Sequence, residues 1–315
     1  MTQADKKKFI LSVLTQQWWK AAYDENFTED LVLEFPFAPP GMFQKVEFPQ
    51  TLAHKEWLGR TVRSWDVEVI SIVGLKQPDS DVFFLTYHVK GAVHWGGNDG
   101  TYQNRVIDRV TLRDGKICNI REWSNPFQYI WAAGREIPTF HVSLDHHANI
   151  GPALHQPLPP TPEYDLSPEA CEARRAENID RFGSDRPGYA CTPIKVPEGF
   201  LRYVWFVPPE MKDYYSAEEE PFMSLWSNLS TESFRFLPGA IVYETEDPNE
   251  AFFEASAYGM YHWEGNHSYG GYMNRYLMHI TMNEQGLCNR YDEYLNPINK
   301  MNSINQSIPS FPWLY

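Results

Sequence analysis

The chain contains two copies of one module, and this duplication limits its possible folds more than any other feature of the sequence. Residues 37–42 read Phe-Ala-Pro-Pro-Gly-Met, and residues 206–211, which lie 169 positions later, read Phe-Val-Pro-Pro-Glu-Met. Further motifs recur at offsets of 168 to 171: His94-Trp95 as His262-Trp263, Asn104-Arg105 as Asn274-Arg275, and residues 122–126 as residues 293–297. Solenoid repeats are much shorter and more numerous. The sequence therefore predicts a duplicated domain.

A proline-rich segment separates the two copies. Seven prolines lie between residues 138 and 168, which predicts a stiff and extended connector. We expect a first module over residues 1–138, a linker over residues 139–167 and a second module over residues 168–315. Asp145-His146-His147 lies in this linker without a known companion ligand spacing, so we expect no metal site there.

Composition argues against several classes of protein. With 315 residues, of which 43% are hydrophobic, the chain is long enough for two cores. Its net charge of -14 argues against binding to nucleic acid or anionic membranes, because no basic patch could neutralise phosphates. No apolar run approaches the 18 residues of a membrane span, and we expect a soluble cytoplasmic protein. Four cysteines without a Cys-x-x-Cys spacing indicate neither a disulfide framework nor a zinc site.

Each copy shows helical periodicity first and strand alternation afterwards, which is the order of an α+β module. In the first copy we expect helices over residues 8–22 and 50–60, strands over 65–73, 82–95, 102–113 and 116–123, and a short helix over 126–133. In the second copy we expect a helix over 168–181 and strands over 200–206, 233–244, 251–263, 271–283 and 287–294. The Asp114-Gly115 pair predicts a hairpin between the last two strands of the first copy.

Alternation along those two strands places two carboxyl groups on an otherwise apolar face. Glu122 shares a face with Ile120, and Asp108 shares one with Val106 and Val110. A carboxyl group on the concave apolar face of a sheet loses solvation, which raises its pKa and suits it to proton transfer near neutral pH. A second interpretation stays open, in which Glu122 lies at a frayed strand end and reaches water.

Four motifs of the first copy together resemble one protein family. They are Gly91-Ala-Val-His-Trp-Gly-Gly, Tyr102-Gln-Asn, Asp114-Gly-Lys-Ile and Arg121-Glu-Trp-Ser-Asn-Pro-Phe. This set resembles the phenazine-biosynthesis proteins PhzA and PhzB, of the SnoaL-like, nuclear transport factor 2-like superfamily. The resemblance implies an α+β cone, in which helices pack on a curved antiparallel sheet around one pocket per module. It also implies that the tandem copies form a fused pseudo-dimer, which could assemble further into homo-oligomers.

The same resemblance implies an acid/base site in the first module. The catalytic glutamate of the family matches Glu122, and its histidine partner matches His54, eleven residues before Trp65. Trp57 matches a family tryptophan, whereas Leu58 stands where the family has a serine, so the substrate contacts of that serine do not carry over. Without the resemblance, a half-buried histidine with a backbone partner is the alternative for His54.

The second copy departs from this set. Met223 corresponds to His54, Met278 to Asp108 and Ser227 to Leu58, while Glu293 corresponds to Glu122. The resemblance therefore places the fuller acid/base set in the first copy.

We expect contacts to a small-molecule substrate from residues of both copies. These candidates are Trp57, Trp65, Tyr87, Tyr102, Asn104, Ser227 and Glu293. Trp131 is a further candidate for the pocket wall. For the aromatic residues, a role in the core is the alternative.

Together with the resemblance, these residues predict a cofactor-free acid/base enzyme of specialised metabolism. The resemblance implies that it condenses, isomerises or cyclises a small carbonyl or amino-ketone intermediate. Glu122 would move the proton, His54 would be the complementary acid or oxygen-binding group, and Asp108 would orient or tune one of them. The sequence contains no phosphate-binding or nucleotide fingerprint. The alternative is a non-catalytic small-molecule-binding or scaffold protein with a degenerate second pocket, in which Glu122 would be solvated or paired with an arginine. A third possibility is a catalytic first module beside a degenerate second module that serves the interface or holds a second substrate.

Overall fold

The computed structural model describes residues 1–139, 163–183, 201–207, 214–216, 231–262 and 269–313. The chain divides into two compact units, Met1–Ile137 with Ile308–Tyr315, and Pro138–Ser307, and each is described by itself. Most of the expected linker lies outside the described residues. The end of the chain differs from the expectation, because residues 308–313 belong to the first unit rather than to the second module. The reason is aromatic burial, since Phe311 and Trp313 belong to the core of the first unit.

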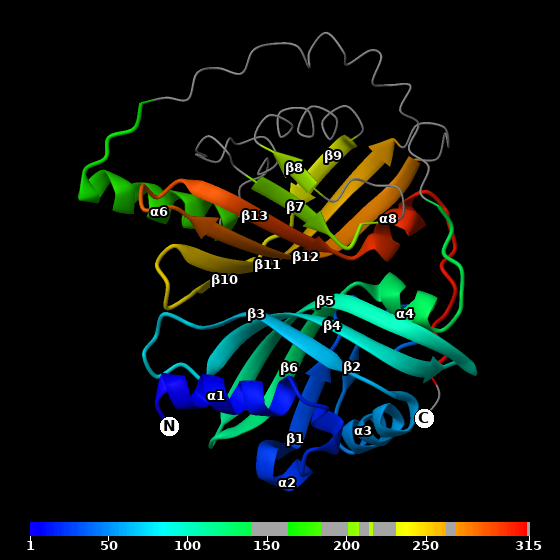
Figure 1. The fold of residues 1–315 in the computed structure, drawn as a ribbon. Helices are drawn as coiled ribbons and strands as arrows, with labels where there is room; N and C mark the ends of the chain where they lie inside the picture. Colours follow the sequence, from blue (N-terminus) through cyan, green and yellow to red (C-terminus); the bar gives the residue numbers. More distant parts are fainter. Residues whose placement is uncertain (140–162, 184–200, 208–213, 217–230, 263–268, 314–315) are drawn as a thin grey trace. The chain divides into compact units, whose positions relative to one another are not determined.

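The first unit combines one curved sheet with helices (Figure 1). Its helices are α1 (Gln3–Leu14), the 3-10 helix η1 (Trp18–Lys20), α2 (Tyr23–Asn26), α3 (Gln50–Thr61) and α4 (Pro126–Ala132). Its strands are β1 (Phe27–Glu34), β2 (Lys45–Val46), β3 (Asp66–Gly74), β4 (Val82–Trp95), β5 (Asn98–Arg113) and β6 (Lys116–Ser124). The structure confirms the expected four-stranded meander and the two later helices to within a few residues.

The first helix begins and ends earlier than residues 8–22, the range that periodicity predicted. Thr2 Oγ1 accepts a hydrogen bond from Asp5 N at 3.2 Å, and the Asp5 carboxylate accepts one from Thr2 N at 3.1 Å. This capping box sets the start of α1 at Gln3, and the helix ends at Leu14. Apolar spacing therefore located the buried face of this helix but not its ends.

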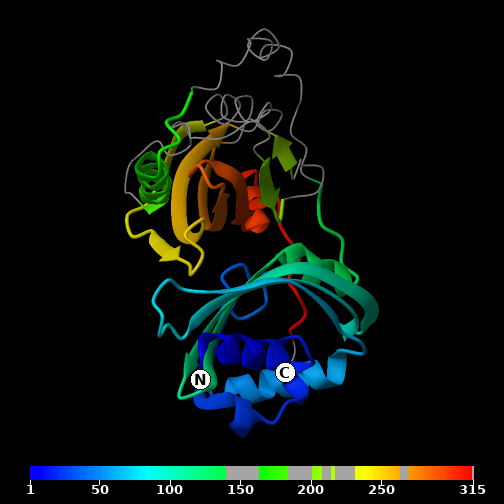
Figure 2. The ribbon, with the colours of Figure 1, turned by 60° about the vertical axis from the view of Figure 1, so that its left-hand side comes forward.

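The sheet of the first unit is mixed rather than wholly antiparallel. Its strand order is β2-β1-β6-β5-β4-β3, and the meander from β3 to β6 is antiparallel throughout. Strand β1 runs parallel to β6, with Leu33 opposite Ile120. A parallel pair requires a long connection, and the chain between β1 and the meander, which includes α3, provides it. The sheet curves over α1 and α3, which cover its concave face (Figures 1 and 2).

The second unit repeats this arrangement of strands. Its helices are α6 (Pro168–Gly183) and α8 (Pro297–Ser303), and its strands are β7 (Leu201–Trp205), β8 (Tyr214–Ser216), β9 (Thr231–Phe236), β10 (Ile241–Glu244), β11 (Glu250–His262), β12 (Tyr269–Met282) and β13 (Cys288–Leu295). The strand order is β10-β11-β12-β13-β7-β8, and β13 is parallel to β7. Residues 233–244, which we expected as one strand, contribute to both β9 and β10, because Gly239 has a φ of +96° between them.

The two units also share a buried hydrogen-bonding motif. Asn104 Nδ2 donates to Asn125 O at 3.1 Å, and Asn274 Nδ2 donates to Asn296 O at 3.1 Å. Asn125 and Asn296 each precede a proline, and each side chain caps the helix that follows, α4 or α8. This motif explains why the Asn-Arg and Asn-Pro pairs recur in the sequence, and it identifies them as part of the scaffold.

Within the described ranges, no helix is long and apolar enough to cross a membrane. The same ranges contain no group of three or more His, Cys, Asp or Glu side chains that could hold a metal ion. Asp145-His146-His147 lies outside them. The expected cytoplasmic location stays a prediction.

Candidate active site in the first unit

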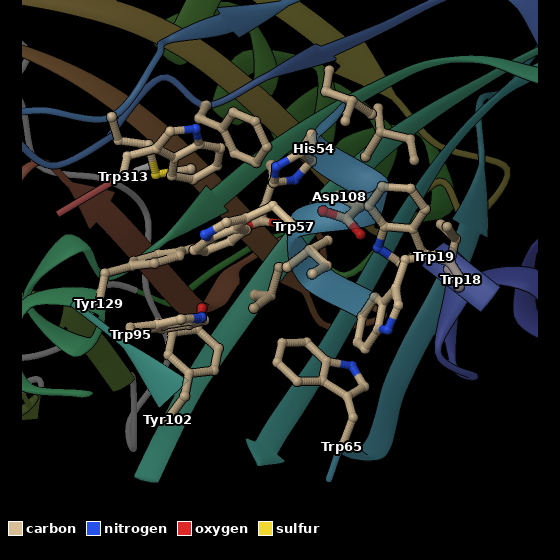
Figure 3. Close-up of a pocket in the computed structure, with 18 of the residues that line it drawn as sticks. Trp18, Trp19, His54, Trp57, Trp65, Trp95, Tyr102, Asp108, Tyr129 and Trp313 are labelled. Atoms are coloured by element: carbon tan, nitrogen blue, oxygen red, sulfur yellow. The ribbon is translucent and has the colours of Figure 1, made fainter. Parts of the chain in front are cut away.

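An aromatic cavity lies between the concave face of the first sheet and its helices (Figure 3). Six tryptophans contribute to its wall: Trp18, Trp19, Trp57, Trp65, Trp95 and Trp313. The volume open to the centre of a water molecule is about 60 Å³, which is room for several waters. None of the described residues that line the cavity is Lys or Arg, whereas Asp108 and Glu122 both line it.

The rings of the wall stack on one another in series. Trp57 stacks on Trp95 with ring centroids 5.7 Å apart and an interplanar angle of 16°. Trp95 stacks on Tyr129 at 5.7 Å and 12°, and Trp65 stacks on Tyr102 at 5.5 Å and 7°. Because each ring is held by neighbouring rings, the cavity is pre-formed, and its parallel faces suit a flat ligand.

The carboxyl group of Glu122 enters the cavity from β6 and accepts two hydrogen bonds. Ser124 Oγ donates to Oε1 at 2.8 Å and Tyr129 Oη donates to the same oxygen at 2.7 Å. Burial raises the pKa of Glu122, and these two hydrogen bonds offset part of the rise. Strand β6 continues to Ser124, so Glu122 is not at a frayed end, and the neighbouring Arg121 pairs with Glu34 instead.

Asp108 lies directly opposite Glu122 on strand β5. Such cross-strand neighbours have Cβ atoms about 5 Å apart. Asp108 is 2% exposed, its Oδ2 accepts a hydrogen bond from Tyr87 Oη at 3.1 Å, and its Oδ1 has no partner among the described residues. Burial raises the pKa of Asp108 well above its usual value, and the charge of Glu122 raises it further. The hydrogen bond from Tyr87 offsets only part of this rise.

The two carboxyl groups therefore differ in how far their pKa values are raised. Glu122 receives two hydrogen bonds, which offset part of the rise, whereas Asp108 receives one and its pKa is raised well above its usual value. Two like charges this close would repel each other strongly in a buried site. Neighbouring carboxyl groups whose environments separate their pKa values are typical of acid/base sites.

We expect Asp108→Asn to raise the thermal stability of the protein by a few degrees at pH 8. Because the folded pKa of Asp108 is raised, the stability that this group contributes is present at low pH and lost as pH rises from the ordinary value of 3.8 through the folded pKa. Asparagine resembles the protonated acid and does not ionise. Thermal unfolding at pH 4 and pH 8 measures this, with the exposed Asp66→Asn as control. A lower melting temperature than wild type at pH 8 would contradict a protonated Asp108.

His54 lies on α3 within the aromatic wall, where it is 4% exposed. It stacks on Trp57 at 5.9 Å and 19°, and on Trp313 at 4.8 Å and 9°. Burial lowers the pKa of His54 to about 3, so the imidazole is neutral at ordinary pH. Nδ1 is buried without a hydrogen-bond partner among the described residues. Two roles were expected for His54, a complementary acid or an oxygen-binding group. A neutral imidazole suits oxygen binding, whereas an acid would require the protonated, cationic form.

The structure brings most of the expected site residues to this one cavity. The expected residues that line it are Glu122, His54, Asp108, Trp57, Trp65, Tyr87 and Tyr102. Asn104 does not, because its amide holds Asn125 in the shared scaffold motif. Trp131 is 42% exposed and lies outside the wall. Glu293 lies in the second unit, where Tyr291 Oη donates to its Oε2 at 3.1 Å, and Ser227 lies outside the described residues.

Sequence reasoning missed Trp95, Tyr129 and Trp313, which also line the cavity. Tyr129 follows the helix cap Asn125 by four residues, so it lies one turn into α4, and this spacing could have indicated it. Trp95 recurs as Trp263, so a comparison of the two copies does not distinguish it as a site residue. Trp313 carries no local signal, because it follows the second module in the sequence.

A separate buried charge network lies in the second unit. Asp292 is 1% exposed and accepts hydrogen bonds from Arg290 Nε at 2.8 Å and Trp205 Nε1 at 2.9 Å. His279 Nδ1 lies 3.5 Å from Asp292 Oδ2, and His279 Nε2 lies 2.7 Å from Glu250 Oε1. Burial alone would lower the pKa of His279, but these carboxylate partners outweigh it and the net direction is upward. The network lies on β7, β11, β12 and β13. Since His279 follows Met278 on β12, it lies on the opposite face of the sheet from Met278, the counterpart of Asp108.

One curated relative decides the family. An uncharacterized PhzA/B-like protein of Pseudomonas aeruginosa is 32% identical to this chain over 111 residues, which are 74% of that protein and 34% of this chain. The chain belongs to the PhzA/B-like family. Together with the two sheets of matching strand order, this membership confirms the expected α+β fold in tandem copies. No protein-family model matches the sequence.

Two solved structures are similar in fold to parts of this PhzA/B-like chain. A phenazine biosynthesis-related protein of Pseudomonas aeruginosa has a TM-score of 0.38 and 16% identity, over 48% of this chain and 93% of its own. A candidate SnoaL-like polyketide cyclase from Jannaschia has a TM-score of 0.34 and 16% identity, over 42% of this chain and 94% of its own.

Proposed function

We propose that the first unit of this PhzA/B-like chain is an enzyme that moves a proton at carbon next to a carbonyl or imine group, without a cofactor. The observation that carries the proposal is the pair of Asp108 and Glu122, which lie opposite each other in the cavity with different hydrogen bonds. Carboxyl groups whose environments separate their pKa values are typical of acid/base sites. Burying two of them is costly, and proton transfer is a use that offsets this cost.

In this mechanism Glu122 is the base and Asp108 is the acid. Glu122 removes a proton from the carbon next to the carbonyl, and negative charge moves to the carbonyl oxygen. Asp108 donates a hydrogen bond to that oxygen, which stabilises the charge as it develops. Neutral His54 is a second hydrogen-bonding group for the substrate. Return of the proton to a conjugated carbon completes an isomerisation. Alternatively the enolate attacks a second carbonyl or imine, whose oxygen or nitrogen takes the proton from Glu122; this closes a ring or joins two molecules, and loss of water or amine from the adduct completes a condensation.

The wall of the cavity favours a flat, neutral or cationic substrate over an anionic one. Two carboxyl groups and no Lys or Arg line the described wall, so a substrate carboxylate would be repelled. Aromatic faces attract cations, which suits a protonated amino ketone. Membership of a family named for phenazine proteins supports a place in specialised metabolism.

The isomerisation of 3-cyclohexenone to 2-cyclohexenone tests the proposal. This reaction removes a proton from C2 and adds one at C4, and ultraviolet absorbance of the conjugated product follows it. We expect the wild-type protein to accelerate it with a bell-shaped pH profile, which rises as Glu122 ionises and falls as Asp108 loses its proton. A rate equal to that in buffer at every pH would contradict the proposed reaction class.

We expect Tyr129→Phe to shift the rising limb of that profile to higher pH by about one to two units. Tyr129 donates to the Glu122 carboxylate, and a hydrogen bond to a charged group is worth about 1.5–3 kcal/mol. Losing it raises the pKa of Glu122 further. Tyr291→Phe is the matched control, since Tyr291 donates to Glu293 in the second unit and should leave the profile unchanged. A limb that stays in place or moves down in Tyr129→Phe would show that Glu122 is not the titrating base.

A further inference from the structure

The last described segment of the chain, residues 308–313, packs into the first unit. Phe311 N donates a hydrogen bond to Pro40 O at 2.6 Å. Phe311 is 2% exposed and Trp313 is 9% exposed. The segment is therefore held by specific packing against the first unit.

Trp313 forms part of the cavity wall itself. Its ring stacks on Trp57 at 4.6 Å and 23°, and on His54 at 4.8 Å and 9°. The Phe311 ring contacts the Trp313 ring at 5.9 Å and 64°, and it lies edge-on to Trp95 at 5.4 Å and 89°. His54 Nδ1, buried without a partner among the described residues, lies in the imidazole that Trp313 covers. The segment therefore reaches the ligand-facing side of the cavity (Figure 3).

Two glycines make room for this segment. Gly41 has a φ of +87°, and a Cβ added there would lie 2.6 Å from Phe311 O. Gly96 has a φ of +59°, and a Cβ added there would lie 2.4 Å from Pro312 Cγ. Both distances are shorter than real side chains tolerate, so any other residue at either position would displace the segment.

The second copy of the module lacks both glycines. Glu210 corresponds to Gly41 and Glu264 corresponds to Gly96, whereas the neighbouring Gly97 keeps a glycine as its counterpart, Gly265. The two copies thus differ at the positions where the C-terminal segment approaches the first unit. The two glycines are therefore specific to the copy that receives the segment and are not a general feature of the repeat.

We propose that residues 308–313 complete the ligand site of the first unit, with Trp313 as a ligand-contacting residue that sets its preference for flat rings. The inference rests on the proposed use of this cavity, but it concerns binding and is independent of the proton-transfer step. A variant of Glu122 can lose turnover while Trp313 still binds the ring, so the two proposals fail separately.

The first test measures binding of acetophenone, a flat neutral ketone, to the full-length chain labelled with ¹⁵N-tryptophan. We expect acetophenone to shift the indole signal of Trp313, assigned with Trp313→Phe, and to leave that of Trp205 in the second unit unchanged. N-methylpyridinium should also bind, whereas benzoate should bind at least tenfold more weakly than acetophenone. Trp313→Ala should weaken acetophenone binding at least tenfold, whereas the exposed Trp131→Ala should not change it.

The second test displaces the segment without touching the cavity. Gly96→Ala and Gly97→Ala place the same side chain in the same turn at positive φ, but nothing lies within 4 Å of a Cβ at Gly97. We therefore expect Gly96→Ala to weaken acetophenone binding about as much as Trp313→Ala, and Gly97→Ala to bind within twofold of wild type. The effects of Gly96→Ala and Trp313→Ala should not add in the double variant, because both act through the same segment.

Three results would overturn the inference. One is a Trp313 indole signal that acetophenone does not move in the wild-type protein, and a second is equal binding by Gly96→Ala and Gly97→Ala. The third is Trp313→Ala binding acetophenone as tightly as wild type or more tightly, which would make Trp313 a plug that competes with the ligand. The shift of the Trp313 indole signal is measured in the wild-type protein. It can therefore refute the inference even if Trp313→Ala does not fold.

Discussion

Replacing Glu122 with glutamine is expected to lower the kcat for isomerisation of 3-cyclohexenone by about 10²- to 10⁴-fold, the usual contribution of a positioned general base. Glutamine keeps the shape of the side chain and can still accept hydrogen bonds from Ser124 and Tyr129. It cannot take a proton from carbon. The binding of acetophenone should therefore change by less than threefold, which would separate lost chemistry from lost binding.

The duplication supplies a matched control for this experiment. Glu293 occupies the position of Glu122 in the second unit and accepts a hydrogen bond from Tyr291, but its cross-strand neighbour is Met278 rather than a carboxyl group. Glu293→Gln should leave turnover close to wild type, because the acid partner is absent there. Wild-type turnover in Glu122→Gln would remove Glu122 from the mechanism, and equal losses in both variants would place chemistry in both units.

Replacing Asp292 with asparagine is expected to destabilise the second unit by about 1.5–3 kcal/mol, the usual worth of hydrogen bonds to a charged group, because the Arg290 side chain is 36% exposed and the ion pair is only partly buried. Asp292 is 1% exposed and accepts hydrogen bonds from Arg290 and Trp205, with His279 beside it. Asparagine leaves the Arg290 charge without its buried counter-ion. Urea denaturation, followed by circular dichroism, measures the change. The exposed Glu284→Gln should change stability by less than about 0.5 kcal/mol.

The pH dependence of this network gives a second measure of the same variant. Burial alone would raise the pKa of Asp292, but hydrogen bonds with His279 and Arg290 lower it, so its stabilisation is lost as pH falls through the folded pKa. The pKa of His279 is raised, so its contribution is present below the ordinary value of 6.5 and lost as pH rises through the folded pKa. The loss of stability in Asp292→Asn should therefore be largest at pH 5 to 6. A uniform loss from pH 4 to 9 would contradict the charge network.

Local signals in the sequence located the elements that later form the sheet. Strand β4 has the bounds that alternation predicted, and the Asp114-Gly115 hairpin lies where expected, with φ values of 54° and 77° that few other residue pairs adopt readily. The predicted ends of α1 were wrong, and the break between β9 and β10 was missed. A capping box and a single positive φ override periodicity at these places. These features act through one or two backbone dihedrals, which a pattern over ten residues does not resolve.

The candidate site was partly visible in the sequence for the same reason. Alternation put Asp108 and Glu122 on the inner face, but it could not say that they are direct cross-strand partners, since register depends on the whole meander. Nor could it distinguish their protonation, which depends on donors such as Tyr129 from another element. The role expected for His54 changed because its pKa depends on the rings packed around it.

The repeat was determined by the sequence alone, because it needs only a comparison of the two copies. The α+β class and the inward carboxyl groups were as well, because each depends on residues that are close along the chain. Only the tertiary structure decided that Trp313 lies beside His54, about 260 positions away in the sequence, and that Gly41 and Gly96 make room for the segment that carries it. Such contacts are set by the shape and burial of surfaces that meet only after folding. In a duplicated chain, they can also make two similar copies unequal.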